Sequence, residues 1–407
     1  MTKDKVNFVI FFSIFFFPLF PTIMVNSQVH INILVFLLSI LYLVIYKKSV
    51  DFSSNKVVIS YYLVLLLLLS VSFIFDIASL EISIGSGFSY LRPLMLLVIT
   101  IAAIDAVKNS DFVCKQRLAL IVLVSTLYVF VELILNSQPY FHELVFYLYK
   151  REFRFELLFY AVTFFGTSYY SGYAFLILFF LALINYNKYQ TTLFGFLLVV
   201  LTALLVLLSQ SKSMIFSLFI CIYLYAFFKS KSLLLKSILF FFPFALVFLF
   251  FINKDVISNL LISTELRSLK SLDTLLMNTS NSGTLNVRFE QIISAFNSAY
   301  EKSIFFGSGL GRDESLESLP AVYFFRYGLL SIFFHYFVVF FIVVFSFIKM
   351  RELRKSDDFI YPLVVFLWAF TLPLTQFSGV MVEMSKLSYM SALMVGYLLK
   401  LRGLSAK

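Results

Sequence analysis

Hydrophobic segments of about 20 residues recur along this chain of 407 residues, with short polar links between them. A helix of that length crosses the roughly 30 Å of hydrocarbon in a bilayer. The alternation of apolar and polar positions that is typical of a membrane β-barrel does not occur in these segments. We therefore predict an all-α, polytopic membrane protein of about 12 transmembrane helices. The expected spans are residues 6–24, 29–46, 57–75, 88–106, 117–136, 168–185, 191–208, 212–228, 233–252, 320–348, 359–376 and 384–401.

One long polar interruption, residues 253–320, stands out from this pattern. Inside it, residues 255–277 and 288–302 repeat apolar side chains at helical spacing, so we expect two amphipathic helices on the membrane surface or on the rim of the bundle. A shorter polar connection covers residues 137–167. The predicted regions are residues 1–252 with spans one to nine, the large loop 253–320, and residues 321–407 with spans ten to twelve.

Composition supports the membrane assignment. The chain is 61% hydrophobic and 13% charged, whereas ordinary globular domains are about 45–50% apolar and roughly 25% charged. The net charge of +10 does not indicate nucleic-acid binding, because the basic residues concentrate in every second connection and at the C-terminus. We predict that both termini are cytoplasmic and that the two larger loops lie on the other side of the membrane. The short connections 24–29 and 77–87 on that other side contain no Lys or Arg.

Metal and disulfide chemistry are not expected. The two cysteines, Cys114 and Cys221, have no metal-ligand spacing, and the three histidines lie far apart in the sequence. We predict no metal site and no cofactor.

Several charged residues fall at the outer ends of the predicted spans or in the outer loops. Charged groups within spans are costly, so they often mark functional sites. Arginine grips phosphate oxygens with two parallel hydrogen bonds, and we therefore predict an outward-facing cationic cavity for a lipid-linked phosphate or pyrophosphate. The residues concerned are Arg92, Lys212, Arg326, Glu383 and Lys386 in or beside spans, and Arg154, Arg288 and Arg312 in the loops.

Each of these residues also has a structural interpretation. Arg92 and Arg326 could extend to the lipid headgroups. Arg288 opens the predicted helix 288–302, where a cation opposes the helix dipole, and this placement favours a functional role. Glu317 is a candidate general base, whereas His335 is expected to be a packed core residue.

The loop and the span that follows it resemble a known family. Arg288-Phe289, Ala295, the run Phe306–Gly311 and Tyr327-Gly328-Leu329-Leu330 resemble the C-terminal signature of bacterial O-antigen polymerases, and O-antigen ligases share a version of it. The run Ser209–Ser213 looks like the Ser-x-Ser-Arg turn of these proteins, with Lys212 in place of Arg.

Two further comparisons with that family refine the resemblance. Arg154 followed by Gly166 looks like the arginine-then-glycine pattern of the earlier periplasmic loop, with a gap one residue longer than in some members. The ligase branch usually has a His-Asn pair after the glycine cluster, but here residues 313–320 read Asp-Glu-Ser-Leu-Glu-Ser-Leu-Pro. This departure favours the polymerase.

The resemblance implies a membrane glycosyltransferase bundle of the GT-C type in the bacterial inner membrane, with periplasmic large loops. It implies polymerisation of repeat units carried on undecaprenyl pyrophosphate, among membrane lipids, with a chain-length regulator protein as a further partner and no nucleic acid. A ligase that transfers glycan to lipid A-core, and a flippase for lipid-linked oligosaccharides, remain the alternatives; the long loop favours the polymerase over the flippase. The expected pyrophosphate ligands are Arg288 and Arg154, with Arg312, Lys212, Arg92 and Arg326 as supporting charges and Glu317 as the acid/base.

Overall fold

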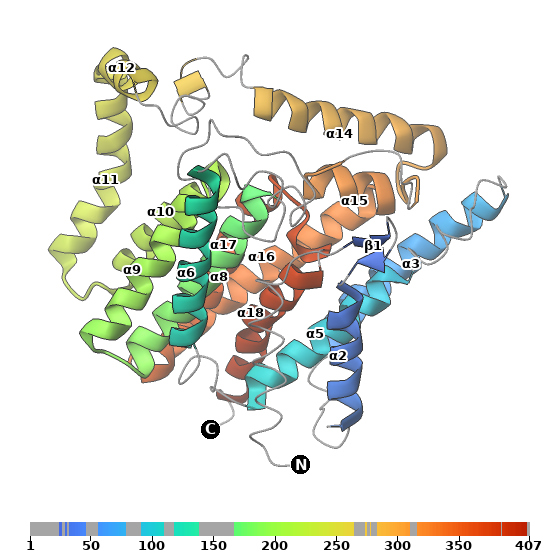
Figure 1. Cartoon of the computed structure of the whole chain (residues 1–407), viewed down its shortest axis with the longest axis horizontal. Helices are drawn as coiled ribbons and strands as arrows, with labels where there is room; N and C mark the ends of the chain where they lie inside the picture. The colour runs from blue at the N-terminus through green and yellow to red at the C-terminus, as the bar shows by residue number, and fades with distance from the viewer. Residues whose placement is uncertain are drawn as a thin grey trace.

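The computed structural model describes residues 24–26, 29–30, 32–45, 56–78, 91–109, 118–137, 167–263, 273–274, 277, 283–309, 316–383 and 385–404. Within these ranges the fold is helical (Figure 1), apart from one short antiparallel pair of strands. In that pair β1 (Met24–Asn26) and β2 (Val29–His30) align Met24 with His30 and Asn26 with Val29. The predicted helical class is therefore correct for nearly all of the described chain.

The described helices follow one another along the chain. Their bounds are α2 (Asn32–Ile45), α3 (Lys56–Ala78), α5 (Arg92–Asn109), α6 (Leu118–Ser137), α8 (Ser168–Lys188), α9 (Leu193–Leu208), α10 (Lys212–Lys229), α11 (Leu233–Ile252), α12 (Lys254–Ser263), α14 (Gly283–Lys302), α15 (Leu319–Tyr327), α16 (Leu329–Glu352), η5 (Asp357–Phe359), α17 (Ile360–Gln376), η6 (Met381–Glu383) and α18 (Ser385–Leu404).

Five of the described helices are long and apolar enough to cross a membrane. Four more described apolar segments, residues 36–45, 118–134, 193–208 and 233–245, are shorter. The length and composition of these helices thus fit a helical membrane protein. Our expectation of twelve spans exceeds the five candidates found among the described residues. The first expected span, residues 6–24, lies outside the described residues except for Met24. The five candidates are Lys56–Ile74, Ser168–Lys188, Lys212–Lys229, Leu329–Glu352 and Asp357–Gln376.

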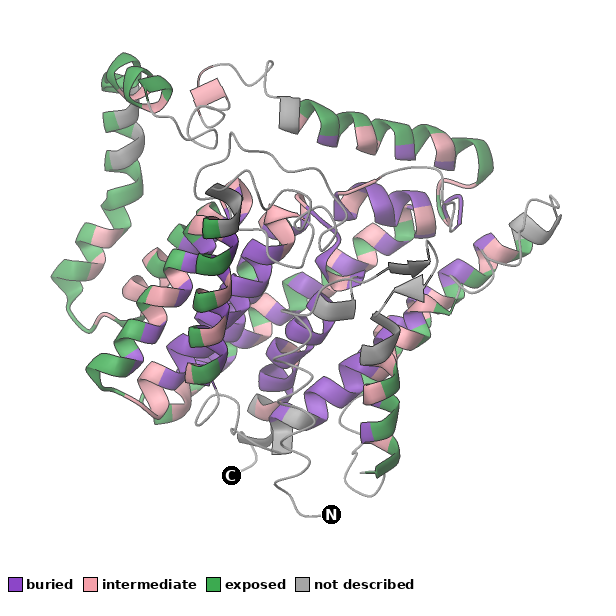
Figure 2. Ribbon diagram, in the orientation of Figure 1, coloured by how far each residue is buried: buried purple, intermediate pink, exposed green. Residues whose placement is uncertain are grey.

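The core of the bundle is formed around α8 and α17. Nearly all residues of both helices are buried (Figure 2), so other helices, and not lipid, surround them. The helices around them expose large side chains, such as Phe333, Phe337 and Phe340 on α16. These outward apolar faces can contact the hydrocarbon of the lipids, because apolar side chains need no hydrogen-bond partner there.

The expected span 320–348 is wrong in one respect, because the structure breaks it at Gly328 into α15 and α16. Gly328 has φ +76°, a left-handed conformation that favours glycine. A Cβ at Gly328 would lie 2.2 Å from the carbonyl oxygen of Phe305, and one at Gly307 would lie 2.6 Å from the Gly328 nitrogen. The two glycines therefore allow the backbone around Gly307 to contact the backbone around Gly328 directly. The glycine cluster thus closes the loop against the start of α16.

Two backbone hydrogen bonds stabilise the contact between these two segments. Leu329 N–H donates to Ile304 at 2.9 Å, and Ser308 N–H donates to Phe325 at 2.6 Å. On the other side of the bend, Ser318 caps the first turn of α15 by accepting from Ala321 N–H, with Pro320 in that turn. Both features are typical of a helix start, which explains why α15 begins where the sequence re-enters the bundle.

The amphipathic helix expected at 288–302 is confirmed as α14, although it begins earlier, at Gly283. Arg288 therefore lies in the second turn of α14. Our expectation that its charge opposes the dipole at the start of a helix is wrong. α14 lies across one end of the bundle, above α15 (Figure 1), and buries Ala295 and Ala299 against Phe324 and Phe325. Of the other expected loop helix, 255–277, the structure describes α12 and residues 273–274 and 277.

Gly328→Ala tests the backbone contact. The Cβ would need both a strained φ and a displaced Phe305 carbonyl, and strain at such a position costs on the order of 1–3 kcal/mol. We expect a lower midpoint of thermal unfolding for the purified protein in detergent. Asn297→Ala, on the exposed face of α14, is the control and should unfold with the wild type. Equal midpoints for all three proteins would contradict the proposed contact.

Candidate functional site

The first charged group at the α14 end of the bundle is centred on Arg288. This side chain projects from α14 and is 9% exposed, and its Nη1 forms an ion pair with Glu317 just before α15. The guanidinium carbon also lies 5.5 Å from the ring centre of Tyr169 in the first turn of α8, a cation–π distance. Gln291, one turn further along α14, accepts a hydrogen bond from the Glu317 backbone N–H at 3.2 Å. Three elements distant in sequence therefore meet at Arg288.

The buried Nη1 of Arg288 lies directly against a carboxylate oxygen of Glu317, which supplies its counter-charge. Burying a guanidinium costs free energy unless it is paired in this way. Glu317 has a side chain that is 45% exposed, so the pair is accessible from outside the bundle. This arrangement can receive an anionic oxygen and offers it a guanidinium donor next to a carboxylate.

Close packing positions the aromatic wall of this site. A Cβ at Gly379 would lie 2.7 Å from the Tyr169 ring, so a side chain there would displace it. Tyr169 and Tyr170 pack edge to face with ring centres 4.5 Å apart. Phe289 of α14 contacts Phe377 at the end of α17, with ring centres 6.0 Å apart. The end of α17 and the start of α8 thus form the floor below α14.

The second charged group is centred on Glu383 in η6. Its carboxylate is 4% exposed and forms ion pairs with Arg326 of α15 and, at 3.6 Å, with Arg92 at the start of α5. Tyr327 donates a hydrogen bond from its hydroxyl to the other carboxylate oxygen at 3.0 Å. Two cations therefore share one carboxylate, and the exposed fractions of 41% for Arg92 and 23% for Arg326 leave their remaining N–H groups accessible.

The surroundings of Tyr327 and Arg326 determine whether these two side chains are protonated. Burial raises the pKa of the Tyr327 phenol well above its usual value, and the adjacent Glu383 carboxylate raises it further. Tyr327, which lies on α15 outside the candidate membrane spans, therefore stays a neutral donor to Glu383 at physiological pH. Burial opposes the charge on Arg326, but Glu383 outweighs that effect and raises the pKa of the guanidinium.

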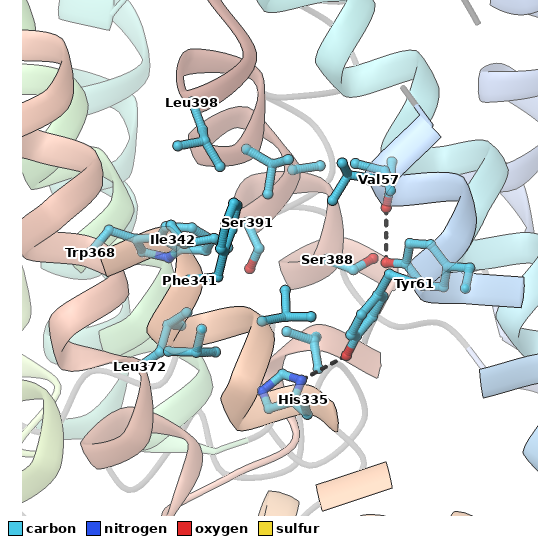
Figure 3. Close-up of a pocket in the computed structure, with 18 of the residues that line it drawn as sticks. Val57, Tyr61, His335, Phe341, Ile342, Trp368, Leu372, Ser388, Ser391 and Leu398 are labelled. Atoms are coloured by element: carbon cyan, nitrogen blue, oxygen red, sulfur yellow. Dashed lines mark hydrogen bonds between the residues drawn. The ribbon is translucent and has the colours of Figure 1, made fainter. Parts of the chain in front are cut away.

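A chain of hydrogen bonds lies beside this group inside the bundle, where the Tyr323 and Tyr327 rings pack with centres 5.2 Å apart. Tyr61 of α3 contacts the Tyr323 hydroxyl at 3.2 Å and Nδ1 of His335 at 2.6 Å. The other ring nitrogen of His335 contacts Oε1 of Gln376 at 2.9 Å. His335 is buried and fully engaged, which confirms the expectation of a packed core residue. Figure 3 shows Tyr61 and His335 together at one end of a cavity.

Lys212 opens α10, directly after the turn that begins at Ser209. Gln210 in this turn has φ +52°, and Ser209 packs so closely on α8 that a Cβ at Gly172 would lie 2.6 Å from its Oγ. Because Gly172 is one turn along α8 from Tyr169, Lys212 lies at the same end of the bundle as Arg288.

The structure brings some of the predicted site residues together in pairs. Arg288 meets Glu317, and Arg92 meets Arg326 through Glu383. Neither Arg92 nor Arg326 is a solitary cation reaching for headgroups, because both are paired. Arg154, the second expected pyrophosphate ligand, and Arg312, an expected supporting charge, lie outside the described residues.

Sequence reasoning missed the partners. It noted Glu383 only as a charge at the start of span twelve, and it did not identify the roles of Tyr169, Tyr327 or Gln376. A usable signal existed for Glu383, since two arginines within apolar segments require a buried counter-charge. Among the described residues, no group of three or more His, Cys, Asp or Glu side chains could hold a metal ion.

Comparison with known proteins adds no family assignment. A scan against protein-family models finds no matching family, and a search of curated proteins finds no matching sequence. The likeness to O-antigen polymerases therefore rests on the residues and motifs of this chain.

Glu383 and Arg92 should differ in their contribution to stability. Glu383→Gln removes the shared carboxylate and leaves two cations close together, and breaking a buried ion pair in this way costs about 3–5 kcal/mol. Arg92→Gln should cost much less, because 41% of the Arg92 side chain is exposed and Glu383 keeps its ion pair with Arg326. Thermal unfolding in detergent measures both variants. Equal losses would mean that the shared carboxylate does not organise this group.

Proposed function

We propose that this protein is an O-antigen polymerase, a membrane glycosyltransferase of the GT-C type that joins repeat units carried on undecaprenyl pyrophosphate. The observation that carries the proposal is the Arg288 site. A buried guanidinium, its half-exposed partner Glu317 and the Tyr169 ring meet beneath α14. The same stretch of sequence carries the family resemblance, so geometry and motif point to the same residues.

The proposed reaction uses these groups without a metal or cofactor. The acceptor sugar hydroxyl attacks the anomeric carbon of the donor glycan, the new glycosidic bond forms, and the bond from that carbon to the pyrophosphate oxygen breaks. Glu317 takes the hydroxyl proton, and the Arg288 guanidinium stabilises the charge that develops on the departing pyrophosphate. Arg154, Arg312 and Lys212 supply further positive charge in this proposal.

Holding both substrates in the membrane supplies much of the remaining rate enhancement, because it converts an encounter of two molecules into a reaction between oriented neighbours. The amphipathic helix α14 can help to hold the substrates, since it carries Arg288 and lies across the end of the bundle (Figure 1). Its exposed apolar residues Phe289, Ile293 and Phe296 suit contact with the membrane surface or with substrate.

The distribution of basic residues supports a periplasmic position for this site. The end of the bundle opposite α14 is rich in lysine and arginine, and cytoplasmic ends of membrane helices carry that excess. Contacts that define the opposite end include the Lys188–Asp358 ion pair and Lys400 at 4.9 Å from the Tyr361 ring centre. The proposal includes about twelve spans in the bacterial inner membrane, cytoplasmic termini and a chain-length regulator as partner. The basic residues at that end are Lys188, Lys229, Lys349, Arg351, Arg354, Lys355 and Lys400.

Complementation in a strain that lacks this protein tests the proposal. The wild type should restore a ladder of lipopolysaccharide bands, whereas Arg288→Ala and Arg288→Lys should leave core with a single repeat unit, because lysine cannot make the forked contact. Glu317→Gln should also lose the ladder. Loss of one such electrostatic donor typically costs about 10²–10³-fold in rate.

Arg351→Ala, an exposed arginine at the opposite end of the bundle, is the matched control and should keep the ladder. Immunoblots of the membrane fraction establish equal amounts of each variant. A deletion strain that shows only bare core would contradict polymerase activity and favour a flippase or a ligase. A ladder retained by Arg288→Ala would exclude the proposed role of this residue.

A further inference from the structure

An apolar cavity of about 370 Å³ lies inside the bundle, apart from the Arg288 site. Most of its walls come from α3, α16, α17 and α18, and its size is within the roughly 300–1,000 Å³ range of ligand pockets. Figure 3 shows His335 and Tyr61 at one end and Leu398 at the other. Nearly all of the lining is hydrocarbon, represented by Val338 and Leu372.

Hydroxyl groups on the walls of the cavity are paired with one another. The hydroxyl of Tyr62 lies 3.0 Å from Oγ1 of Thr100, and the hydroxyl of Tyr173 lies 2.8 Å from Oγ of Ser391. A space with such walls offers water few hydrogen bonds and favours an apolar occupant. The cavity therefore suits hydrocarbon.

One buried polar group at the edge of the cavity has a different character. Gln376 lines the cavity and is fully buried, and its side-chain Nε2 has no hydrogen-bond partner among the described residues. Its Oε1 lies 2.9 Å from a ring nitrogen of His335, and the other ring nitrogen contacts the Tyr61 hydroxyl. A buried amide donor is stabilised when a ligand brings an acceptor oxygen to it. An apolar occupant that carries one neutral oxygen acceptor at its end fits both features.

The position of Gln376 indicates the kind of acceptor. Gln376 is the last residue of α17, and Phe377 after it contacts Phe289 of α14, so the amide lies near the end of the bundle that α14 crosses. In a glycerophospholipid, the ester carbonyls lie between the polar head and the hydrocarbon, at the edge of the bilayer core. A prenyl phosphate has no carbonyl, and its nearest oxygens belong to a charged phosphate that is costly to bring to a buried amide. The Gln376 donor therefore favours an acyl ester.

The cavity also has a side that faces the bilayer. Val57 of α3 and both Phe337 and Phe341 of α16 line the cavity and are exposed on the outside of the bundle. The cavity therefore opens sideways between α3 and α16. A lipid with two chains can place one chain inside through such an opening, while the other chain stays among the neighbouring lipids.

We infer that this cavity binds one acyl chain of a glycerophospholipid from the surrounding bilayer, and that the ester carbonyl of this chain accepts a hydrogen bond from Gln376 Nε2. The bound chain fills the space between α3 and the helices α16 to α18, and it joins these elements through many weak hydrocarbon contacts. The inference goes beyond the proposed function, because this lipid is not consumed and its site does not depend on the reaction.

Native mass spectrometry of the protein released from nanodiscs tests the inference. The nanodiscs contain diacyl phosphatidylcholine and its diether analogue, which has chains of the same length but no ester carbonyl, at equal mole fraction. The wild type should retain one phosphatidylcholine, with about fivefold more of the diacyl lipid, since one net hydrogen bond contributes a factor of that order. Gln376→Leu should remove this preference.

Val338→Phe and Val344→Phe form a matched pair of variants on α16. Val338→Phe overfills the cavity and should reduce retention of both lipids about tenfold or more. Val344→Phe makes the same change on the lipid-facing side of α16, outside the cavity, and should retain lipid like the wild type. Equal retention of the diacyl and diether lipids by the wild type, or unchanged retention by Val338→Phe, would overturn the inference. Loss of retention by Val344→Phe would also overturn it, because the effect would not be specific to the cavity.

A second set of nanodiscs, which adds undecaprenyl phosphate to the diacyl lipid, separates this inference from the proposed function. Continued retention of one phosphatidylcholine supports the inference. Replacement of the bound phosphatidylcholine by undecaprenyl phosphate would overturn it, because the cavity would then hold the carrier lipid. Retention of phosphatidylcholine by a protein that makes no ladder in complementation would disprove only the proposed function.

Discussion

The close backbone contact between Gly307 and Gly328 is the constraint on which the rest of the outer end depends. It joins the segment that follows α14 to the bend between α15 and α16, with hydrogen bonds on both sides of the bend. This junction fixes α14 above the start of α8, so Arg288 reaches Tyr169 and Glu317. It also ends α15 at Tyr327, where Arg326 and Tyr327 meet Glu383. Two separate charged groups are thus positioned by one pair of glycines.

The low dielectric of the bundle explains why these charges occur in groups. An isolated guanidinium buried among hydrocarbon is costly, so each arginine that leaves the surface must be paired. Arg288 is neutralised by one carboxylate, whereas Arg92 and Arg326 share another. The two groups therefore differ in charge, because the Arg288–Glu317 pair is neutral overall whereas the Arg92–Glu383–Arg326 group keeps one net positive charge.

Pattern alone predicted a helical membrane protein, the amphipathic helix at 288–302 and the burial of His335, because period and hydropathy depend on local sequence. It did not predict the break at Gly328, since a glycine within an apolar run does not reveal that another backbone segment touches it. It also placed Arg92 and Arg326 in a single cationic site with Arg288. Pairing through Glu383 depends on how α5, α15 and η6 meet, and that arrangement has no signature in any one of the three segments.

Phe337 of α16 lines the apolar cavity between α3, α16, α17 and α18 and is also exposed on the outer face of the bundle, so the cavity lies next to the bilayer. This position determines which concentration would control the occupancy of the cavity by an apolar ligand. A ligand that arrives through the bilayer is supplied in two dimensions, so the occupancy of the cavity follows the mole fraction of that lipid in the membrane and not its amount per volume of solution. A modest intrinsic affinity is then sufficient, because the membrane has already concentrated and oriented the ligand.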